Sequence, residues 1–237
     1  MSQQNPFYSL FETPFQTVPF NLIKNDHFLP AIKRGIIQTR MEINAIKKCL
    51  DPPSFENTIV ALEESGTLLN KVSKTLYNLN SSETSDELQK IAQEVSPLLT
   101  SLNNEIKLDK KLFERVKFVY NANDSLSGEE NMLLEKTYKS FVRNGAGLDP
   151  KSQDRFKEVT VELSSLGLKF AENLLAETNK YELVLKEQSD LSGLPQNLID
   201  RAKALAIKTN RPDKWIFTLQ APSYIPFMEN SDHRGLR

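Results

Sequence analysis

The side chains that could hold a metal ion or act as a base are few and far apart in this chain. Two histidines, His27 and His233, occur among the 237 residues, and neither begins a His-Glu-x-x-His arrangement. A catalytic zinc ion needs about three strong protein ligands and an open position. Histidines at opposite ends of the chain do not supply them, so we expect no metal ligand. For His27 we expect packing or hydrogen bonding in the first turn of a helix.

Nucleophilic and acid–base chemistry also lacks support in the sequence. Cys49 is the one cysteine, and it lies near the expected C-terminal end of a helix, where the helix dipole does not lower a thiol pKa. The carboxylate pairs Glu63-Glu64 and Glu129-Glu130 would need burial to raise one pKa of each pair. We expect solvated carboxylates instead, with Glu130 capping a helix. No catalytic, cofactor-binding or metal-binding residue is therefore predicted.

The elements that would position such side chains are mainly helices. Asp26 precedes a helix with Pro30 in its first turn, and the pair Pro52-Pro53 ends it. The apolar face of this helix comprises Leu29, Ile32, Ile36, Ile43, Ile46 and Leu50. Ser54 then provides an N-cap, and a second helix is expected to run to about residue 80. Its apolar stripe comprises Ile59, Leu62, Leu69, Val72, Leu76 and Leu79.

Further helix starts and stops follow along the chain. The run 84–87, Thr-Ser-Asp-Glu, fits a capping box with a threonine followed three residues later by a glutamate. The helix that follows this capping box contains Pro97, which should kink it. A shorter helix carries Leu112, Phe113, Val116, Val119 and Tyr120. The run 127–130, Ser-Gly-Glu-Glu, is a second capping box. The run 144–147, Asn-Gly-Ala-Gly, is typical of a C-cap and turn, and it lacks the Gly-Lys-Ser/Thr of a phosphate loop.

The clearest helical pattern in the chain comes next. Asp149 and Pro150 are the N-cap and first residues expected of a helix. The apolar residues that follow are spaced by 3, 4, 3, 4 and 4 positions, which is one face of a helix. They are Phe156, Val159, Leu163, Leu166, Phe170 and Leu174.

After this helix the spacing of apolar residues is no longer helical. Two short runs, at 181–186 and 214–219, have residues that favour β-strands. We predict that they pair as a ribbon, with a helix from about 195 to 209 between them; the long connection leaves the pairing direction open. The fold class is thus all-α, with long antiparallel helices and a minor two-stranded β-ribbon. We expect one domain or part-domain: an extended arm over 1–21, helices over 22–180, and the ribbon with its helix over 181–237. The aromatic anchors expected in the arm are Phe7, Tyr8, Phe11, Phe15 and Phe20.

Composition excludes some partners. Thirty lysines and arginines against 31 aspartates and glutamates give a formal net charge of −1, so nothing favours nucleic acid or an anionic membrane surface. The start of the chain has neither the basic nor the apolar region of a signal peptide, and no apolar run approaches the roughly 20 residues of a membrane span. A cytoplasmic protein is expected.

Several strings in order carry a family resemblance. They include NPFYSLFETPFQTVPFNLIKNDHFLPAI, PPSFENTIVALEESGTLLNKV, ELSSLGLKFAENLLAET and KWIFTLQAPSYIPFMENSDHRGLR. Together they resemble the N-terminal region of the Dcp-type peptidyl-dipeptidases, which are thimet oligopeptidase-like zinc metallopeptidases. The resemblance implies a parent of several hundred residues that removes C-terminal dipeptides from oligopeptides. In that family a zinc-binding His-Glu-x-x-His and a third-ligand glutamate lie in the C-terminal half, so no zinc ligand is expected in this chain.

The resemblance also implies partners. This chain would form one wall of a substrate channel, facing the C-terminal catalytic half of the same protein, with oligopeptides as substrates. An exposed apolar surface, and possible self-association, are expected where that half is absent. The end at Arg237 without a helix stop favours a cut within a longer chain. The alternatives are an oligoendopeptidase of the same family and a stand-alone helical scaffold or peptide-binding module.

Overall fold

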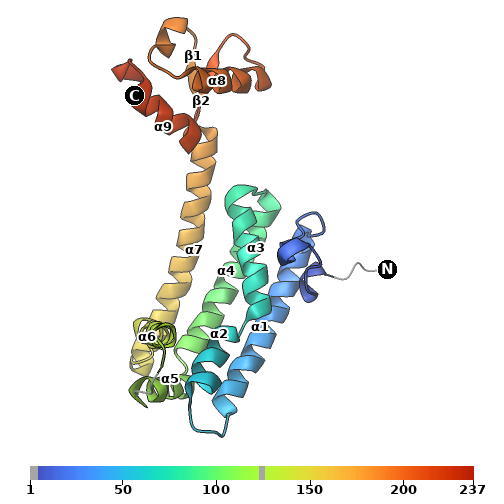
Figure 1. The fold of residues 1–237 in the computed structure, drawn as a ribbon, viewed down its shortest axis with the longest axis vertical. Coiled ribbons are helices and arrows are strands. Elements are labelled where there is room, and N and C mark those ends of the chain that lie inside the picture. Colours follow the sequence, from blue (N-terminus) through green and yellow to red (C-terminus); the bar gives the residue numbers. More distant parts are fainter. Residues whose placement is uncertain (1–4, 123–125) are drawn as a thin grey trace. The chain divides into compact units, whose positions relative to one another are not determined.

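Figure 1 shows the fold as a computed structural model, which describes residues 5–122 and 126–237. The described chain is mainly helical, with a short two-stranded sheet, as the sequence predicts. It divides into two compact units, Met1–Lys169 and Phe170–Arg237. Residues 1–4 of the expected N-terminal arm lie outside the described residues. Across the described residues, no helix is both long enough and apolar enough to cross a membrane.

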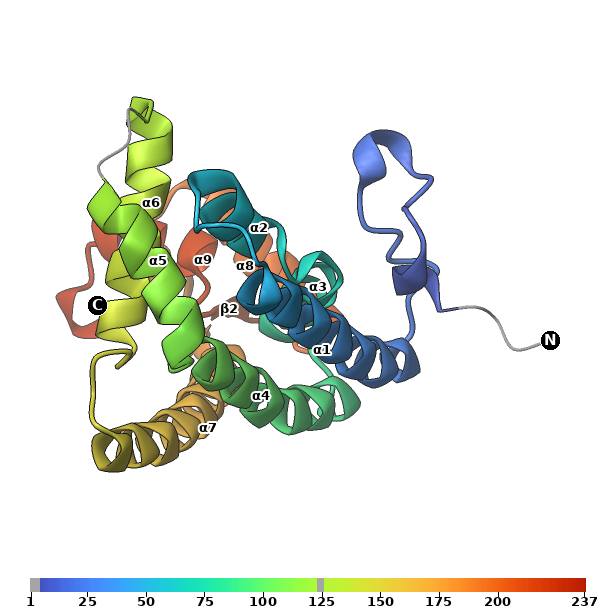
Figure 2. The same cartoon turned by 90° about the horizontal axis from the view of Figure 1, so that it is seen from below.

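Three long helices form one part of the first unit. They are α1 (Asn25–Lys48), α3 (Thr67–Ser82) and α4 (Asp86–Lys107), and they lie side by side in both ribbon views (Figures 1 and 2). The N-terminal arm joins them in a common core. Its buried members are Phe7, Phe11, Phe28, Ala31, Ile32, Ile36, Leu69, Val72, Leu76, Leu88, Val95 and Leu102.

The aromatic residues of the arm differ in burial. Phe7 and Phe11 are buried, in and after a short 3-10 turn at Pro6–Tyr8, and the Phe7 ring lies 5.4 Å from that of Phe28. Phe15, in a second 3-10 turn at Pro14–Gln16, is fully exposed, and Phe20 is half exposed. Tyr8 is partly buried against the same core, as is Val18 further along the arm. Of the five predicted anchors, Phe7, Tyr8 and Phe11 therefore pack on the core, and Phe15 and Phe20 do not.

Helix α1 has most of the predicted face, but both of its ends differ from prediction. The buried members of that face are Ile32, Ile36, Ile43 and Ile46. Leu50 lies beyond the last helical residue and is fully exposed. The helix begins at Asn25 with Lys24 as its N-cap, so Pro30 falls in the second turn instead of the first. The earlier start arises because the His27 ring accepts the Lys24 backbone N–H, which caps the helix before Asp26.

The segment after the proline pair begins as predicted and then departs from a single helix. The Asn57 N–H donates to Ser54 Oγ over 3.2 Å, and the Ser54 N–H donates to Asn57 Oδ1 over 2.9 Å. The first turns are a π-helix at Phe55–Val60, followed by α2 (Ala61–Glu64). Helix α3 then starts anew at Thr67.

The break between α2 and α3 is at Gly66. Its φ of 74° is left-handed, a conformation that glycine adopts without steric cost. Its N–H donates to Glu42 Oε2 of α1 over 2.7 Å. The apolar spacing did not reveal the break, because Leu62 and Leu69 are seven positions apart and two turns of a helix give the same separation.

Helix α4 starts one residue later than the predicted capping box. Ser85 is its N-cap, accepting the Leu88 N–H over 3.2 Å. The predicted cap, Thr84, donates instead to Asn80 Oδ1 over 3.0 Å, so its hydroxyl is engaged by the end of α3. Pro97 lies within α4, as expected.

Two shorter helices complete the first unit's second core. They are α5 (Lys110–Ala122) and α6 (Gly128–Arg143). The predicted capping box at α6 is present: the Ser127 N–H donates to Glu130 Oε2 over 2.7 Å, and the Glu130 N–H donates to Ser127 Oγ over 3.3 Å. The predicted C-cap follows at Asn144, with Gly145 at a left-handed φ of 88°. The buried residues of this core are Ile43, Ile46, Phe55, Ile59, Leu112, Phe113, Val116, Val119, Leu134 and Phe141.

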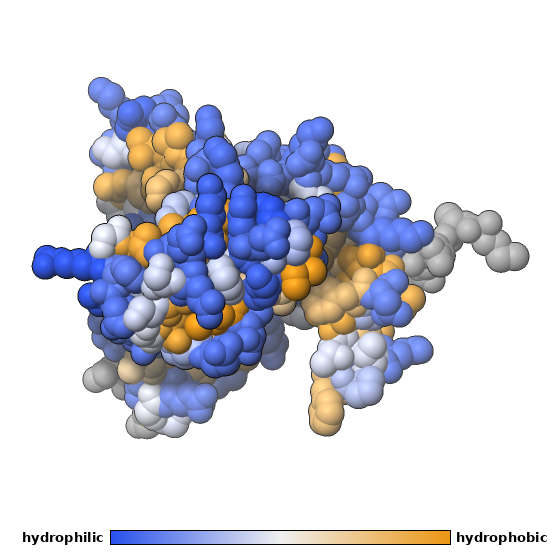
Figure 3. Space-filling model, turned by 90° about the horizontal axis from the view of Figure 1, so that it is seen from above, coloured by the Kyte–Doolittle hydropathy of each residue, from blue (hydrophilic) through white to orange (hydrophobic). Residues whose placement is uncertain are grey.

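The longest helix is α7 (Pro150–Lys180). Its N-cap is Asp149, as predicted, whose Oδ1 accepts the Ser152 N–H over 3.1 Å. Within the described chain, none of its side chains is buried, although its apolar pattern is the most regular in the sequence. On the face of the molecule seen in Figure 3, apolar areas alternate with polar ones.

The second unit contains the predicted ribbon. Strands β1 (Leu183–Leu185) and β2 (Trp215–Phe217) pair antiparallel, with Val184 opposite Ile216. Helices α8 (Gln196–Lys208) and α9 (Ala221–Asn230) accompany them. The core of this unit comprises Leu185, Leu191, Leu194, Leu198, Ala202, Phe217 and Phe227.

Candidate functional site

Both histidines have local structural partners. In α1, the Lys24 N–H donates to His27 Nδ1 over 3.1 Å, and His27 Nε2 lies 3.8 Å from Asp26 Oδ1. The His27 side chain is only 12% exposed. In the second unit, His233 Nε2 lies 2.9 Å from the Ser189 carbonyl oxygen. Each ring is thus held within its own unit by neighbouring backbone.

The cysteine and the carboxylate pairs are also separate from one another. Cys49 is a half-buried free thiol that follows α1. Glu63 and Glu64 are exposed in α2. The hydrogen bond from the Ser127 backbone holds the pKa of Glu130 below its usual value, which keeps that carboxylate charged and is the opposite of what a general acid needs.

No metal centre is assembled from these side chains. Among residues 5–122 and 126–237, no three His, Cys, Asp or Glu side chains lie close enough together to hold a metal ion. The described side chains therefore do not form a zinc site, and no step of chemistry is assigned to zinc in this part of the protein.

The segment after the proline pair connects two parts of the first unit through the side chain of Asn57. Asn57 Oδ1 accepts hydrogen bonds from the Ser54 N–H, from Thr58 Oγ1 over 2.8 Å and from Arg115 Nη2 over 2.9 Å. Asn57 Nδ2 donates to the Pro52 carbonyl over 2.9 Å. Arg115 lies in α5, so Asn57 connects the turn before α2 to the second core.

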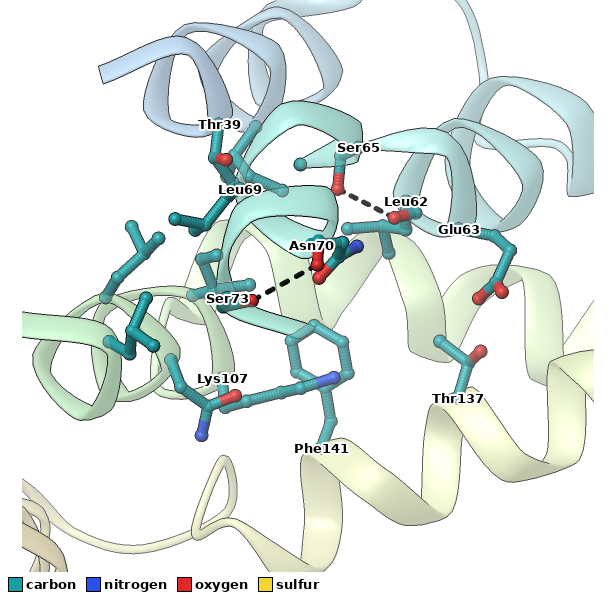
Figure 4. Close-up of a pocket in the computed structure, with 16 residues that line it drawn as sticks. Thr39, Leu62, Glu63, Ser65, Leu69, Asn70, Ser73, Lys107, Thr137 and Phe141 are labelled. Carbon is teal, nitrogen blue, oxygen red and sulfur yellow. Dashed lines mark hydrogen bonds between the residues drawn. The ribbon is translucent and has the colours of Figure 1, made fainter. Parts of the chain in front are cut away.

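A cavity in the first unit is lined by residues of α1, α2, α3, α4 and α6. It has a volume of about 400 Å³, and Figure 4 shows its lining. Helix α1 contributes Thr39, α3 contributes Asn70 and Ser73, and α6 contributes Thr137 and Phe141. A cavity of this size and mixed polarity is in the range of sites for small ligands.

A lysine and a glutamate are the charged groups of this cavity. Lys107, the last residue of α4, extends over the Phe141 ring, with its Nζ 4.4 Å from the ring centroid (Figure 4). Burial lowers the pKa of Lys107, and the charge of Glu63 acts in the opposite direction. No carboxylate in the described part of the chain forms an ion pair with this ammonium group. The arrangement is suited to bind a carboxylate or a peptide carbonyl, and it contains no nucleophile–base pair.

Sequence reasoning did not identify this cavity. Lys107 ends one helix and Phe141 lies near the end of another, far away in the sequence. Neither residue stands in a motif. The only local signal is the basic residue in the last turn of α4, which is expected of any helix C-terminus.

Comparison with known proteins gives a consistent set of relatives. No protein-family model matches the chain. Dipeptidyl carboxypeptidase of Escherichia coli is 32% identical over 239 residues, covering 100% of this chain and 35% of that protein. The dipeptidyl carboxypeptidase of Salmonella typhimurium is 32% identical over 235 residues, covering 98% of this chain and 35% of that protein. Oligopeptidase A of Haemophilus influenzae is 30% identical over 241 residues, covering 100% of this chain and 34% of that protein.

These relatives are much longer than this chain. The chain spans about a third of the length of the curated proteins that it matches, while almost all of its own residues are included in each match. The likeness therefore extends through both compact units. The chain is homologous over its whole length to the N-terminal part of the peptidase family that contains dipeptidyl carboxypeptidase and oligopeptidase A.

Proposed function

We propose that this chain is the N-terminal, non-catalytic part of a zinc-dependent peptidyl-dipeptidase, a cytoplasmic enzyme that removes dipeptides from the C-terminus of oligopeptides. The observation that carries the proposal is the match of the whole chain to about the first third of dipeptidyl carboxypeptidase at 32% identity. The sequence contains no His-Glu-x-x-His, so the zinc ligands and the chemical step belong to the remainder of such an enzyme.

The role proposed for this part is shape and access. It forms one wall of the substrate channel and faces the C-terminal part of the same protein, with oligopeptides between them. The polar cavity beside Lys107 supports a peptide-facing role, because an ammonium group over an aromatic ring attracts carboxylates and carbonyl oxygens. Folded proteins are excluded by such a channel, and short unstructured peptides are admitted.

The second candidate is an oligoendopeptidase of the same family. Oligopeptidase A of Haemophilus influenzae is nearly as similar, at 30% identity. The two activities differ in what they require of the substrate: a peptidyl-dipeptidase needs a free C-terminal carboxylate two residues from the cleaved bond, and an endopeptidase does not.

The test compares the 237-residue chain with the full-length protein encoded by its reading frame. Each is incubated with paired oligopeptides that carry a free or an amidated C-terminus, with and without a chelator, and products are identified by mass spectrometry. We expect chelator-sensitive release of dipeptides from the free-carboxylate peptides by the full-length protein, and no cleavage by the 237-residue chain with or without added zinc.

Two results would contradict this proposal. Zinc-dependent dipeptide release by a clean preparation of the 237-residue chain would show that the catalytic residues are in this part. Equal internal cleavage of free and amidated peptides by the full-length protein would favour the oligoendopeptidase instead.

A further inference from the structure

An apolar face on α7 is exposed. The side chains of Val159, Leu163 and Leu166 are 42%, 65% and 56% exposed. Their positions i, i+4 and i+7 place them on one face of the helix, and we refer to these three residues as the α7 stripe. The same spacing continues at Phe170 and Leu174, where the second unit begins, and both of those side chains are exposed too.

Such a face is costly in water. Fully burying one leucine side chain stabilises a protein by about 1.5–3 kcal/mol relative to leaving it exposed. Single exposed apolar residues are common, but a contiguous apolar stripe on one helix indicates a surface that another element covers. Helix α1 has a comparable pattern, and there Ile32 and Ile36 are buried against neighbouring helices.

The stripe is not the side of α7 that meets the rest of its unit. The hydrogen bond from Asn104 Nδ2 of α4 to Thr160 Oγ1 of α7 is 2.8 Å long, and Asn104 is buried. At 3.6 residues per turn, Thr160 lies about a quarter turn around the helix from the centre of the stripe. The first unit therefore holds α7 by an adjacent side and leaves the stripe uncovered.

We propose that the α7 stripe is the surface on which the C-terminal two thirds of the full-length peptidase packs. This inference rests on the proposed function, since it takes its occupant from the same protein. The support is the length of the relatives: the matched region is 35% of the Escherichia coli dipeptidyl carboxypeptidase, so roughly two thirds of such a chain is available to cover the stripe. The occupant is an apolar groove that accepts the i, i+4 and i+7 side chains of a helix.

A second copy of α7 is a poorer occupant. Stable pairing of two helices along such a seam needs apolar residues sustained over three or four heptads. The exposed pattern from Val159 to Leu174 covers only about two. Packing within one protein needs no such length, because the rest of the interface holds the helix in position.

The test compares two variants of α7, each of which introduces one negative charge on a different face of the helix. Leu166→Glu alters the stripe, and Ser165→Glu is the matched control, since Ser165 is exposed and about 100° away around the helix. Both variants are made in the 237-residue chain and in the full-length protein. In the 237-residue chain we expect equal melting temperatures for the two variants, because both positions face water.

In the full-length protein we expect Leu166→Glu to lower the melting temperature by about 5 °C or more relative to Ser165→Glu, because a buried carboxylate without a partner destabilises the interface. Failure of full-length Leu166→Glu to fold, while the same substitution is harmless in the 237-residue chain, also supports the proposal. Leu166→Met, which preserves apolar volume, should restore the unsubstituted melting temperature.

Two outcomes would overturn the inference. Equal effects of Leu166→Glu and Ser165→Glu in the full-length protein would mean that the stripe is not covered there. The stripe would instead be assigned to a second copy if the unsubstituted full-length protein sediments as a homodimer, and Leu166→Glu converts it to a monomer without changing the melting temperature. Absence of peptidase activity in the full-length protein is a separate matter: it contradicts the proposed function, and the melting comparison still decides the interface.

Discussion

At the scale of single residues, the Asn57 side chain connects two elements of the first unit by hydrogen bonds. Its side chain makes four hydrogen bonds, to Ser54, Thr58, Arg115 and Pro52. These bonds hold the π-helical turn that begins at Phe55. The segment identifies the family in the sequence, and the structure gives the physical reason that an asparagine stands there.

We predict that Asn57→Ala lowers the free energy of unfolding by about 2–4 kcal/mol, since each hydrogen bond contributes about 0.5–1.5 kcal/mol and the partly buried Arg115 loses an acceptor. Urea denaturation followed by circular dichroism measures the change. Asn57→Asp is the control: it loses the Nδ2 donor to the Pro52 carbonyl, but it retains the Oδ1 acceptor and gains attraction to Arg115, so its loss should be smaller. Equal losses for the two variants would mean that the hydrogen bonds accepted by Oδ1, including the one from Arg115, contribute little.

At the scale of elements, the packing of α1 on α3 depends on Gly35. A Cβ atom at this position would lie 3.0 Å from Leu69 Cα and 3.1 Å from Leu69 N. These are backbone atoms, which cannot rotate away as a flexible side chain would. The helices can approach this closely only because residue 35 has no side chain.

We predict that Gly35→Ala destabilises the first unit by about 1 kcal/mol, because overpacking costs about 1–3 kcal/mol and the higher helix propensity of alanine offsets part of it. Gly167→Ala in α7 is the matched control. A Cβ there meets no atom of the described chain within 4 Å, so the same substitution should stabilise by about 0.5–1 kcal/mol. A stabilising Gly35→Ala would show that the α1–α3 contact can widen at little cost.

At the scale of the whole molecule, the unfolding of the second compact unit can be monitored separately from that of the first. The one tryptophan, Trp215, lies in β2 of the second unit, while most of the long helices belong to the first. In the second unit Arg211 holds Glu182 in a two-point ion pair, with Nη1 2.6 Å from Oε2 and Nη2 2.8 Å from Oε1. Hydrogen bonding to Arg211 lowers the pKa of Glu182 below 4.5.

Because the folded-state pKa of Glu182 lies below its unfolded value, this pair stabilises the second unit above about pH 4.5, and the stabilisation is lost as the pH falls through the folded pKa. We predict that the melting temperature from Trp215 fluorescence falls more between pH 7 and pH 3 in the unsubstituted chain than in Glu182→Gln. The pair is partly exposed, so high salt should reduce this difference. A pH dependence unaffected by Glu182→Gln would contradict the prediction.

Much of this fold could be predicted from local patterns. The caps at Ser54, Ser127 and Asp149 follow from side chains that can bond the next free N–H groups. The ribbon of β1 and β2 was predicted from two β-prone runs, but its antiparallel direction was not, because the connection is too long for turn rules. The break at Gly66 depends on Glu42 of another helix, and no local pattern contains that contact.

The sequence by itself determined that the chain is mainly helical, the caps at Ser54, Ser127 and Asp149, and which peptidase family the chain resembles, since these depend on spacing and residue type over short distances. Only the tertiary structure decided which apolar faces are buried. Helix α7 has a more regular stripe than α1, yet Ile32 is buried and Leu163 is 65% exposed. Periodicity records that a helix has an apolar face; burial requires a partner surface, and that depends on which other elements lie against it.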